Sequence, residues 1–151
     1  MRDASIYENI AFGVEKEKIN KSRVRKVAEL ACIKSFIENV LGSYDHYVGE
    51  KGIKLSGGQL QRIGIARALY KEFSLLIMDE ATSALDSDTE KKIINSITNL
   101  KNKPTIIIIA HKFNTLLNCN RVIQIDNGRI VKEGSPREII KSLQKEFNLD
   151  Q

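Results

Sequence analysis

The sequence contains few cysteines and no long hydrophobic run. Its two cysteines, Cys32 and Cys119, lie far apart and form no C-x-x-C pair, so neither a metal site nor a disulfide framework is indicated. The longest uninterrupted apolar run is IIIIA at residues 106–110, far short of the ~20 residues that span a bilayer. The first residues lead into polar sequence without the apolar segment of a signal peptide. We therefore expect a reducing, cytosolic compartment and a membrane reached only through a partner.

A complete phosphate-binding loop is also lacking. The motif G-x-x-x-x-G-K-[ST] holds phosphates with backbone amides and a lysine. Gly52 and Gly57 have the required separation, but Gly58 and Gln59 stand where lysine and serine or threonine are needed. The stretch LLIMDEATSALD at residues 75–86 is nevertheless an apolar run that ends in carboxylates, which indicates a site for a metal ion and a phosphate. The chain thus carries only part of such a site.

Length and charge are compatible with one globular domain and an anionic partner. The 151 residues suit a single domain, and the apolar and charged fractions of 42% and 28% are ordinary for a globular protein. A net charge of +5 permits a nucleotide, a nucleic acid or a lipid surface as partner. The basic residues are scattered apart from a modest cluster at residues 16–26, which a solvated helix face explains at least as well as a nucleic-acid patch.

The first third of the chain is predicted to be mainly helical. Residues 4–13 are short and mixed, which favours a loop with a brief helical turn. Apolar residues recur at helical spacing through residues 24–41 with a break near Ile33, so two short helices are expected. Gly42 is a plausible C-terminal stop, and residues 44–54, which glycines interrupt, are predicted to form a loop.

A longer helix is predicted to begin at Ser56. Ser56 and Gln59 have the spacing of a capping box, and an apolar stripe follows as far as Leu69. Gly57 and Gly58 fall in the first turn, although each glycine costs a helix ~1 kcal/mol relative to alanine. Close approach of the backbone to a ligand is one reason to accept this cost, and a helix N-terminus attracts anions.

Strands and helices alternate in the rest of the chain. Residues 73–78 and 105–110 are short apolar runs, as expected of strands buried on both faces of a parallel sheet. Between them, Ser87 and Glu90 have capping-box spacing and open a helix. The later predicted elements are a short helix, a hairpin that turns at Asn127-Gly128 and an amphipathic helix: residues 113–117, 122–133 and 137–145. This alternation predicts an α/β fold.

Polar residues with catalytic potential follow both predicted strands. Asp79 and Glu80 come at the end of the first strand, and His111 follows the second. Ligands of α/β folds bind beyond the carboxyl ends of the strands. The shared placement therefore indicates a site at this edge.

Four motifs occur in a fixed order: LSGGQ at residues 55–59, LLIMDE at 75–80, SALD at 83–86 and the histidine of IIIIAH at 106–111. With these motifs the chain resembles the nucleotide-binding (ATPase) domain of ABC transporters. The surrounding segments ENIAFG, VGEKGIKLSGGQLQRIGIARAL and DEATSALD resemble the exporter type. The resemblance extends from about residue 5 to residue 147. It implies a partial P-loop NTPase-like fold with a helical subdomain and a C-terminal β-hairpin and helix.

The resemblance implies specific roles for the residues that follow the strands. Asp79 resembles the Walker B aspartate, which helps to hold Mg²⁺, here through water. Glu80 resembles the general base that polarises the water attacking ATP. His111 resembles the switch histidine that contacts the γ-phosphate and links to the glutamate.

The resemblance also implies that part of the site acts on a neighbour. Ser56, Gly57, Gly58 and Gln59 form the signature that closes over the γ-phosphate of ATP bound to the opposite subunit. Asp86 resembles the aspartate of the D-loop, which lies at the dimer interface and helps to couple the two sites. For Gln61, Arg62 and Arg67, which follow the signature, packing near the interface and a solvated helix face are equally good interpretations.

Elements of the family pattern are missing from this sequence. It has no Walker A loop with its lysine, no preceding aromatic residue to stack on adenine and no Q-loop glutamine. We expect a helical subdomain with the signature helix at about residues 4–72 and the C-terminal part of the catalytic α/β core at about residues 73–151. A truncated product and a split subunit that docks on a separate piece both explain the pattern. We expect the chain alone to be poorly stable or to self-associate, and to turn over little ATP.

The expected function is that of an ATP-hydrolysing domain that powers export across a membrane. The implied partners are a second ABC ATPase domain, a transmembrane domain fused upstream or separate, and a segment that bears a Walker A loop; no nucleic acid is expected. The location would be the cytoplasmic face of the membrane. A non-enzymatic split module or remnant that offers its signature face to ATP on a partner is the main alternative. An ATPase head of a DNA-repair or chromosome-organising protein is another, but no sustained heptad run precedes Ser56.

Overall fold

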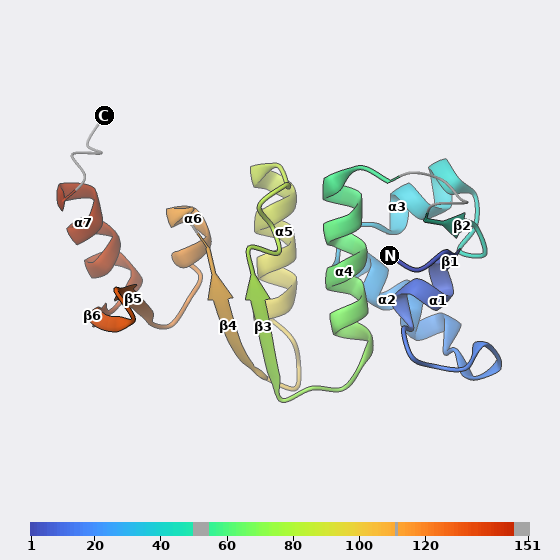
Figure 1. Cartoon of the computed structure of the whole chain (residues 1–151), viewed down its shortest axis with the longest axis horizontal. Helices are drawn as coiled ribbons and strands as arrows, with labels where there is room; N and C mark the ends of the chain where they lie inside the picture. The colour runs from blue at the N-terminus through green and yellow to red at the C-terminus, as the bar shows by residue number, and fades with distance from the viewer. Residues whose placement is uncertain (50–54, 111, 147–151) are drawn as a thin grey trace.

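The computed structural model describes residues 1–49, 55–110 and 112–146. Its elements are β1 (Ala4–Ser5), α1 (Ile6–Ile10), η1 (Lys16–Lys18), α2 (Lys21–Leu30), α3 (Lys34–Phe36), η2 (Ile37–Leu41), β2 (Tyr47–Val48), α4 (Gly57–Tyr70), β3 (Leu75–Asp79), α5 (Ser87–Thr98), β4 (Thr105–Ile109), α6 (Phe113–Leu116), β5 (Val122–Asp126), β6 (Arg129–Gly134) and α7 (Pro136–Glu146). A helical group lies at one end, β3 and β4 with α5 lie in the middle, and the β5–β6 hairpin with α7 lies at the other end (Figure 1). The predicted α/β class and order of elements are confirmed.

The helical group packs α1 and α2 against α4. Asn20 caps the N-terminus of α2, and its side chain accepts a hydrogen bond from the Arg23 amide at 3.0 Å. The chain then breaks at Cys32, where φ is 54°, and α3 with the π-helical η2 ends at Gly42, where φ is 73°. The predicted break near Ile33 and stop at Gly42 are therefore confirmed. The fully buried apolar side chains of this group include Ile6, Ile10, Val24, Ala28, Ile63 and Ala66.

Short strands close the helical group. Ala4 pairs with Val48 and Ser5 with Tyr47 in an antiparallel bridge. The loop predicted for residues 44–54 is wrong at β2, whereas residues 50–54 lie outside the described residues. A bridge this short leaves no alternating pattern in the sequence, because alternation needs several residues to be visible. The brief helical turn predicted within residues 4–13 is confirmed as α1.

β3 and β4 form the parallel pair that carries the site. They are in register from Leu75 opposite Thr105 to Asp79 opposite Ile109. Parallel strands need a crossover connection, and α5 supplies it here. The strand side chains Leu76 and Met78 are buried in the same hydrophobic cluster as the α5 side chains Ile93, Ile94 and Ile97.

The other face of this strand pair is open in the described part of the chain. Leu75 and Ile77 of β3 are 47% and 58% exposed, and Ile107 and Ile109 of β4 are 46% and 48% exposed. The prediction of strands buried on both faces is therefore wrong for the described residues. The reason is that alternate side chains of a strand point to opposite faces, and helices cover only one of them.

The C-terminal part is a hairpin followed by an amphipathic helix. β5 and β6 pair in antiparallel fashion around Asn127 and Gly128, whose φ angles of 48° and 74° suit a two-residue turn. The predicted hairpin is confirmed, with an irregular register between Gln124 and Ile125 that the sequence did not indicate. α7 extends one residue further at each end than predicted and buries its apolar stripe against the hairpin.

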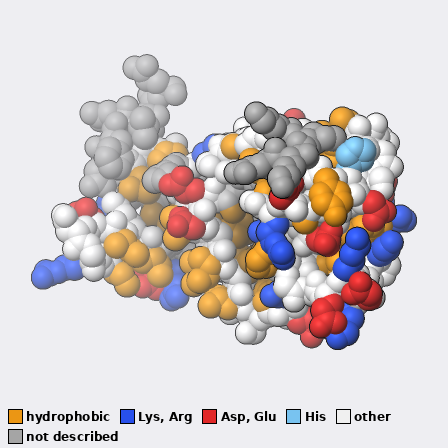
Figure 2. Space-filling model, turned by 45° about the vertical axis from the view of Figure 1, so that its right-hand side comes forward, with side chains coloured by type: hydrophobic (Ala, Val, Ile, Leu, Met, Phe, Trp, Pro, Cys, Tyr) orange, Lys and Arg blue, Asp and Glu red, His pale blue; other side chains and the backbone are white. Residues whose placement is uncertain are grey.

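Charges of both signs are mixed on the helical group. Figure 2 shows Lys and Arg side chains interspersed with Asp and Glu over the face that it presents there. One example is the ion pair between Lys18 and Glu15 at 2.7 Å, with both side chains largely exposed. This pattern matches the solvated helix face predicted for residues 16–26 better than a nucleic-acid patch, which requires charge of one sign.

We expect the open apolar face to make the isolated chain self-associate, because a contiguous exposed apolar surface favours association with another apolar surface. The double variant Ile77→Lys/Ile107→Lys should shift the chain toward monomer, as measured by light scattering after gel filtration over a wide range of concentrations. Val40→Lys is the control, since Val40 is 68% exposed but lies on η2. A wild-type chain that is monomeric at all concentrations would contradict the expectation.

Candidate functional site

Asp79 and Glu80 lie at the carboxyl end of β3. The Glu80 amide donates a hydrogen bond to the Ile109 carbonyl at 3.0 Å, so the turn that follows β3 is held to the end of β4. Both acidic side chains are exposed. His111 lies outside the described residues, so its predicted role stays a prediction.

Glu80 has a strained backbone. Its φ angle is 46°, in the left-handed region that costs a residue with a side chain roughly 1–2 kcal/mol. Such residues persist where the surrounding structure fixes them, and they cluster at functional sites. The hydrogen bond to Ile109 and a further one from the Ser83 amide to the Glu80 carbonyl, at 3.0 Å, fix the backbone here.

Asp86 closes the loop that begins at Glu80. Its side chain caps α5 by accepting a hydrogen bond from the Thr89 amide at 2.9 Å. The hydrogen bonds from the Thr89 backbone and side chain hold the pKa of Asp86 below its ordinary value. The predicted capping box of Ser87 and Glu90 is wrong, because Asp86 is the cap and Glu90 turns into the protein.

The predicted capping box at the start of α4 is confirmed. The Gln59 amide donates to the Ser56 hydroxyl at 3.3 Å, and the Ser56 amide donates to the Gln59 side chain at 2.8 Å. Ser56 and Gly57 are exposed, so the positive end of a fourteen-residue helix faces solvent. This arrangement suits an anion.

A contact within the chain accounts for Gly58. A Cβ atom on Gly58 would lie 3.1 Å from the Ala84 carbonyl oxygen and 3.3 Å from Cδ2 of Leu85, whereas one on Gly57 would lie 3.8 Å from the Ala84 Cβ. The first turn of α4 is thus packed on the loop between β3 and α5. Gly58 permits this packing, and Gly57 leaves room on the exposed side.

Gln61 also joins α4 to the loop between β3 and α5, a role that the sequence did not identify. Its side-chain amide donates to the Ser83 hydroxyl at 2.9 Å and to the Glu80 carbonyl at 3.4 Å, and its side-chain oxygen accepts from the Ala84 amide at 3.0 Å. The available signal was its position one turn below Gly57 and Gly58 on α4, on the side that meets the loop.

Arg62 and Arg67 act in packing rather than as a solvated face. Arg62 donates to the Cys32 carbonyl at 2.8 Å, and Arg67 donates to the Asn9 carbonyl at 2.7 Å. Both bonds join α4 to the rest of the helical group. Of the interpretations that the sequence left open, the structure favours packing.

Glu90 is a second residue that the sequence did not identify. It is 6% exposed and accepts hydrogen bonds from Thr82, Thr115 and Lys112. Burial by itself would raise the pKa of Glu90, but the hydrogen bonds from Thr115, Lys112 and Thr82 outweigh it and hold the pKa below its ordinary value. The signal was its place in the apolar stripe of α5, three residues before Ile93.

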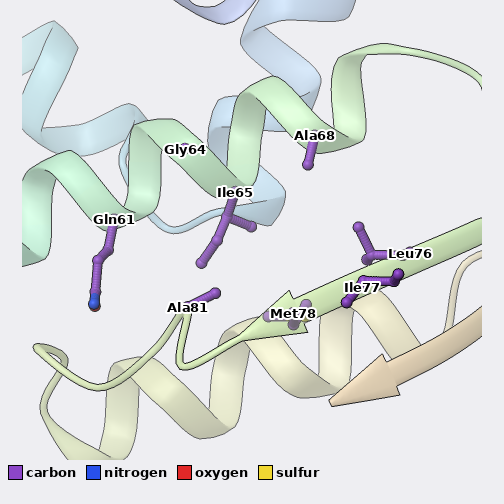
Figure 3. Close-up of a pocket in the computed structure, with 8 residues that line it drawn as sticks. All are labelled: Gln61, Gly64, Ile65, Ala68, Leu76, Ile77, Met78 and Ala81. Carbon is purple, nitrogen blue, oxygen red and sulfur yellow. The ribbon is translucent and has the colours of Figure 1, made fainter. Parts of the chain in front are cut away.

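A cleft of about 250 Å³ lies between α4 and β3. Gln61, Gly64, Ile65 and Ala68 line it from α4, and Leu76, Ile77, Met78 and Ala81 line it from β3 and the residues after it (Figure 3). Apart from Gln61, which points toward the loop beyond Ala81, its lining is apolar. Among the described residues, the lining of the cleft therefore includes no charged side chain for binding a phosphate or a metal ion.

The residues present fit Mg²⁺ only as a weakly ligated ion. Among the described residues no cluster of three or more His, Cys, Asp or Glu side chains is placed to hold a metal. Mg²⁺ often keeps several waters and takes one or two carboxylates, with phosphate oxygens completing its shell. The exposed carboxylate of Asp79 is compatible with this mode of binding.

The fold and the motif-bearing edge together define a partial P-loop NTPase-like α/β protein. A family model for ABC transporters matches residues 2–83, more than half of the chain. The chain therefore belongs to the ABC transporter family, whose ATPase domains bind and hydrolyse ATP. None of the helices in the described part of the chain combines the length and hydrophobicity needed to cross a membrane.

Similar proteins include exporters. An ATP-dependent lipid A-core flippase of Desulfotalea psychrophila is 42% identical over 96% of this chain and 25% of the flippase. The β-(1→2)glucan export ATP-binding/permease protein NdvA of Rhizobium johnstonii is 44% identical over 91% of this chain and 23% of NdvA. A solved bacterial Atm1-family ABC exporter with ATP bound matches 94% of this chain and 24% of its own, at 36% identity and a TM-score of 0.83. The chain thus spans about a quarter of the length of these relatives.

We expect Gly58→Ala and Gly64→Ala to differ in their effect on the free energy of unfolding. Gly64 lies within α4, and an added Cβ would meet no described atom within 4 Å outside the helix backbone, so alanine should stabilise the chain by ~1 kcal/mol. At Gly58 the added methyl group would press on the Ala84 carbonyl, so the helix gain should be lost. Urea unfolding followed by circular dichroism measures both free energies, and equal stabilisation by the two variants would refute the close packing described above.

Proposed function

We propose that this chain forms part of the ATP-binding and ATP-hydrolysing domain of a transporter that powers export across a membrane. The observation that carries the proposal is the strained turn at Glu80, which presents two exposed carboxylates at the shared carboxyl end of β3 and β4. The start of α4, an exposed helix N-terminus, packs on the loop that follows. Groups for a metal ion, a water molecule and a phosphate thus lie on connected segments.

Asp79 and Glu80 would have separate tasks in ATP hydrolysis. Asp79 would help to hold Mg²⁺, chiefly through water, and the ion would offset the charge of the phosphates. Glu80 would take a proton from the attacking water as the general base, because its carboxylate is exposed where a ligand could reach it. His111 would contact the γ-phosphate, which its place after β4 in the sequence supports.

The signature residues Ser56 to Gln59 would act on ATP held by a second ATPase domain. Support comes from the capped and exposed N-terminus of α4, whose amides and dipole attract a phosphate. Asp86 would lie at the interface with that domain; its carboxylate is exposed while it caps α5. A segment with a Walker A loop would supply the remaining phosphate contacts.

The proposed setting is the cytoplasmic face of a membrane, with a transmembrane domain fused to this chain or separate from it. The flippase and export names of the relatives and the share of their length that this chain spans support this setting. Residues 4–72 would be the helical subdomain and residues 73–151 the C-terminal part of the catalytic core. No nucleic acid is proposed as partner.

ATP-dependent association tests the role of the signature. The native mass of the polypeptide in its source cell is measured first, by immunoblot. If the band lies far above 17.1 kDa, the association assay uses that longer polypeptide. If the band lies at 17.1 kDa, the assay uses this chain together with the co-purifying subunit that carries a Walker A loop. Gly57→Asp should abolish ATP-dependent dimerisation, because it places a carboxylate against a phosphate. Gly64→Asp on the same helix is the matched control. Dimerisation that is unaffected by Gly57→Asp would refute the role in trans, and no ATP-dependent association at all would favour a remnant.

ATP turnover tests the role of Glu80. The isolated chain should show negligible turnover, whereas the native assembly should hydrolyse ATP. In that assembly Glu80→Gln should lower kcat on the order of 10² to 10⁴-fold and leave ATP binding in place, because the amide cannot accept the proton. Glu72→Gln is the control, since the Glu72 side chain is 92% exposed and lies outside the site. Wild-type turnover by Glu80→Gln would contradict the assignment.

A further inference from the structure

Glu90 is a charged residue in an otherwise apolar stripe of α5. It shares that face with Ile93, Ile94 and Ile97, each of which is at most 1% exposed, and it is itself 6% exposed. A carboxylate is rarely buried unless it is paired and hydrogen-bonded, because its charge loses the solvation of water. The hydrogen-bond partners of Glu90 therefore show which segments of the chain its carboxylate holds together.

These partners come from separate segments of the chain. The Thr82 hydroxyl donates to Oε1 of Glu90 at 2.9 Å, and the Thr115 hydroxyl donates to the same oxygen at 2.6 Å. The Lys112 ammonium donates to Oε2 at 3.0 Å and lies 3.4 Å from the Leu85 carbonyl oxygen. Thr82 and Leu85 belong to the loop after β3, whereas Lys112 and Thr115 belong to the segment after β4.

The hydroxyl groups of Thr82 and Thr115 depend on Glu90 as their hydrogen-bond acceptor. Thr82 is 6% exposed and Thr115 is 2% exposed, so water cannot easily satisfy their hydroxyl groups. Hydrogen bonds to an ionised group are stronger than neutral ones, and a buried network that loses one member leaves the others unpaired. The loop after β3 and the start of α6 are thus held at a fixed separation through one carboxylate.

We propose that Glu90 is a positioning residue that locks the loop behind Glu80 to the segment after β4, so that the two segments move together. On the opposite side Gln61 holds the same loop to α4, so Glu90 completes its restraint. Lys112 is the residue after His111 in the sequence, so the link joins the segments of both predicted catalytic residues. The importance of this link for catalysis rests on the function proposed above; the link itself does not.

Hydrogen exchange of the full chain tests the link without ATP. Thr115→Val removes one hydroxyl from α6 and changes no atom of the loop after β3. It should nevertheless speed exchange about tenfold at the amides of Ala84 and Leu85, while amides of Ile63 to Ala66 in α4 keep their wild-type rates. Glu90→Gln should likewise speed exchange in the loop after β3 and in the segment after β4. Thr115→Ser keeps the hydroxyl and should therefore show the wild-type exchange rates.

Thr98→Val is the matched control, because within the described part of the chain the Thr98 hydroxyl on α5 donates to carbonyls of its own helix, at 2.9 Å to Ile94 and 3.2 Å to Asn95. It should leave exchange in the loop unchanged. If Thr115→Val changes no rate in the loop, or accelerates α4 as much as the loop, Glu90 is only a stabilising core residue and the proposal is overturned.

The kinetic consequence is measured in the assembly that hydrolyses ATP. Thr115→Val should lower kcat about tenfold and leave the KM for ATP unchanged, because misplacing a catalytic group affects the chemical step rather than binding. A wild-type kcat together with faster loop exchange would overturn the catalytic part of the proposal. An assembly without ATP turnover would refute the proposed function, while the exchange experiment would still decide the link.

Discussion

The loop between β3 and α5 is held from both sides by side-chain hydrogen bonds. On one side Gln61 of α4 bonds to Ser83 and Ala84, and on the other Glu90 of α5 bonds to Thr82. This double restraint explains how a residue such as Glu80 can keep a left-handed backbone, since strain persists only where the surroundings prevent its release. The candidate base thus lies directly before a loop that side chains of α4 and α5 hold by hydrogen bonds.

Hydrogen bonds around the buried Asn9 side chain hold α4 to the rest of the helical group. Asn9 is fully buried, its amide donates to the carbonyls of Ala4 and Ser5 at 3.2 and 3.1 Å, and Arg67 donates to its backbone and side-chain oxygens. These contacts tie the first residues of the chain to the middle of α4. α4 is therefore attached both to the helical group, through Asn9 and Arg67, and to the loop behind Glu80, through Gln61.

The two ends of this arrangement face different ligands in the function that we propose. The N-terminus of α4 offers amides to a phosphate of a neighbouring domain, whereas Asp79 and Glu80 face the metal and the water of a site on their own side. Because Gly58 and Gln61 join these parts directly, binding at one site would, in that function, change the geometry at the other. Coupling of this kind needs a packed contact with few alternative arrangements, which the close approach of Gly58 to Ala84 provides.

The sequence by itself determined the order of the elements, the capping box at Ser56, the turn at Asn127-Gly128 and the placement of Asp79 and Glu80 at a strand end. These features depend on local spacing and backbone preference, which neighbouring residues fix. Motif order also determined the family. Tertiary structure alone decided which face of β3 is covered, that Asp86 rather than Ser87 caps α5, and that Gln61 and Glu90 hold the loop. Each of these features depends on which segments meet in space. Residues 61, 82, 90 and 115 become neighbours only when strands and helices pack, so no local sequence pattern predicts their contacts.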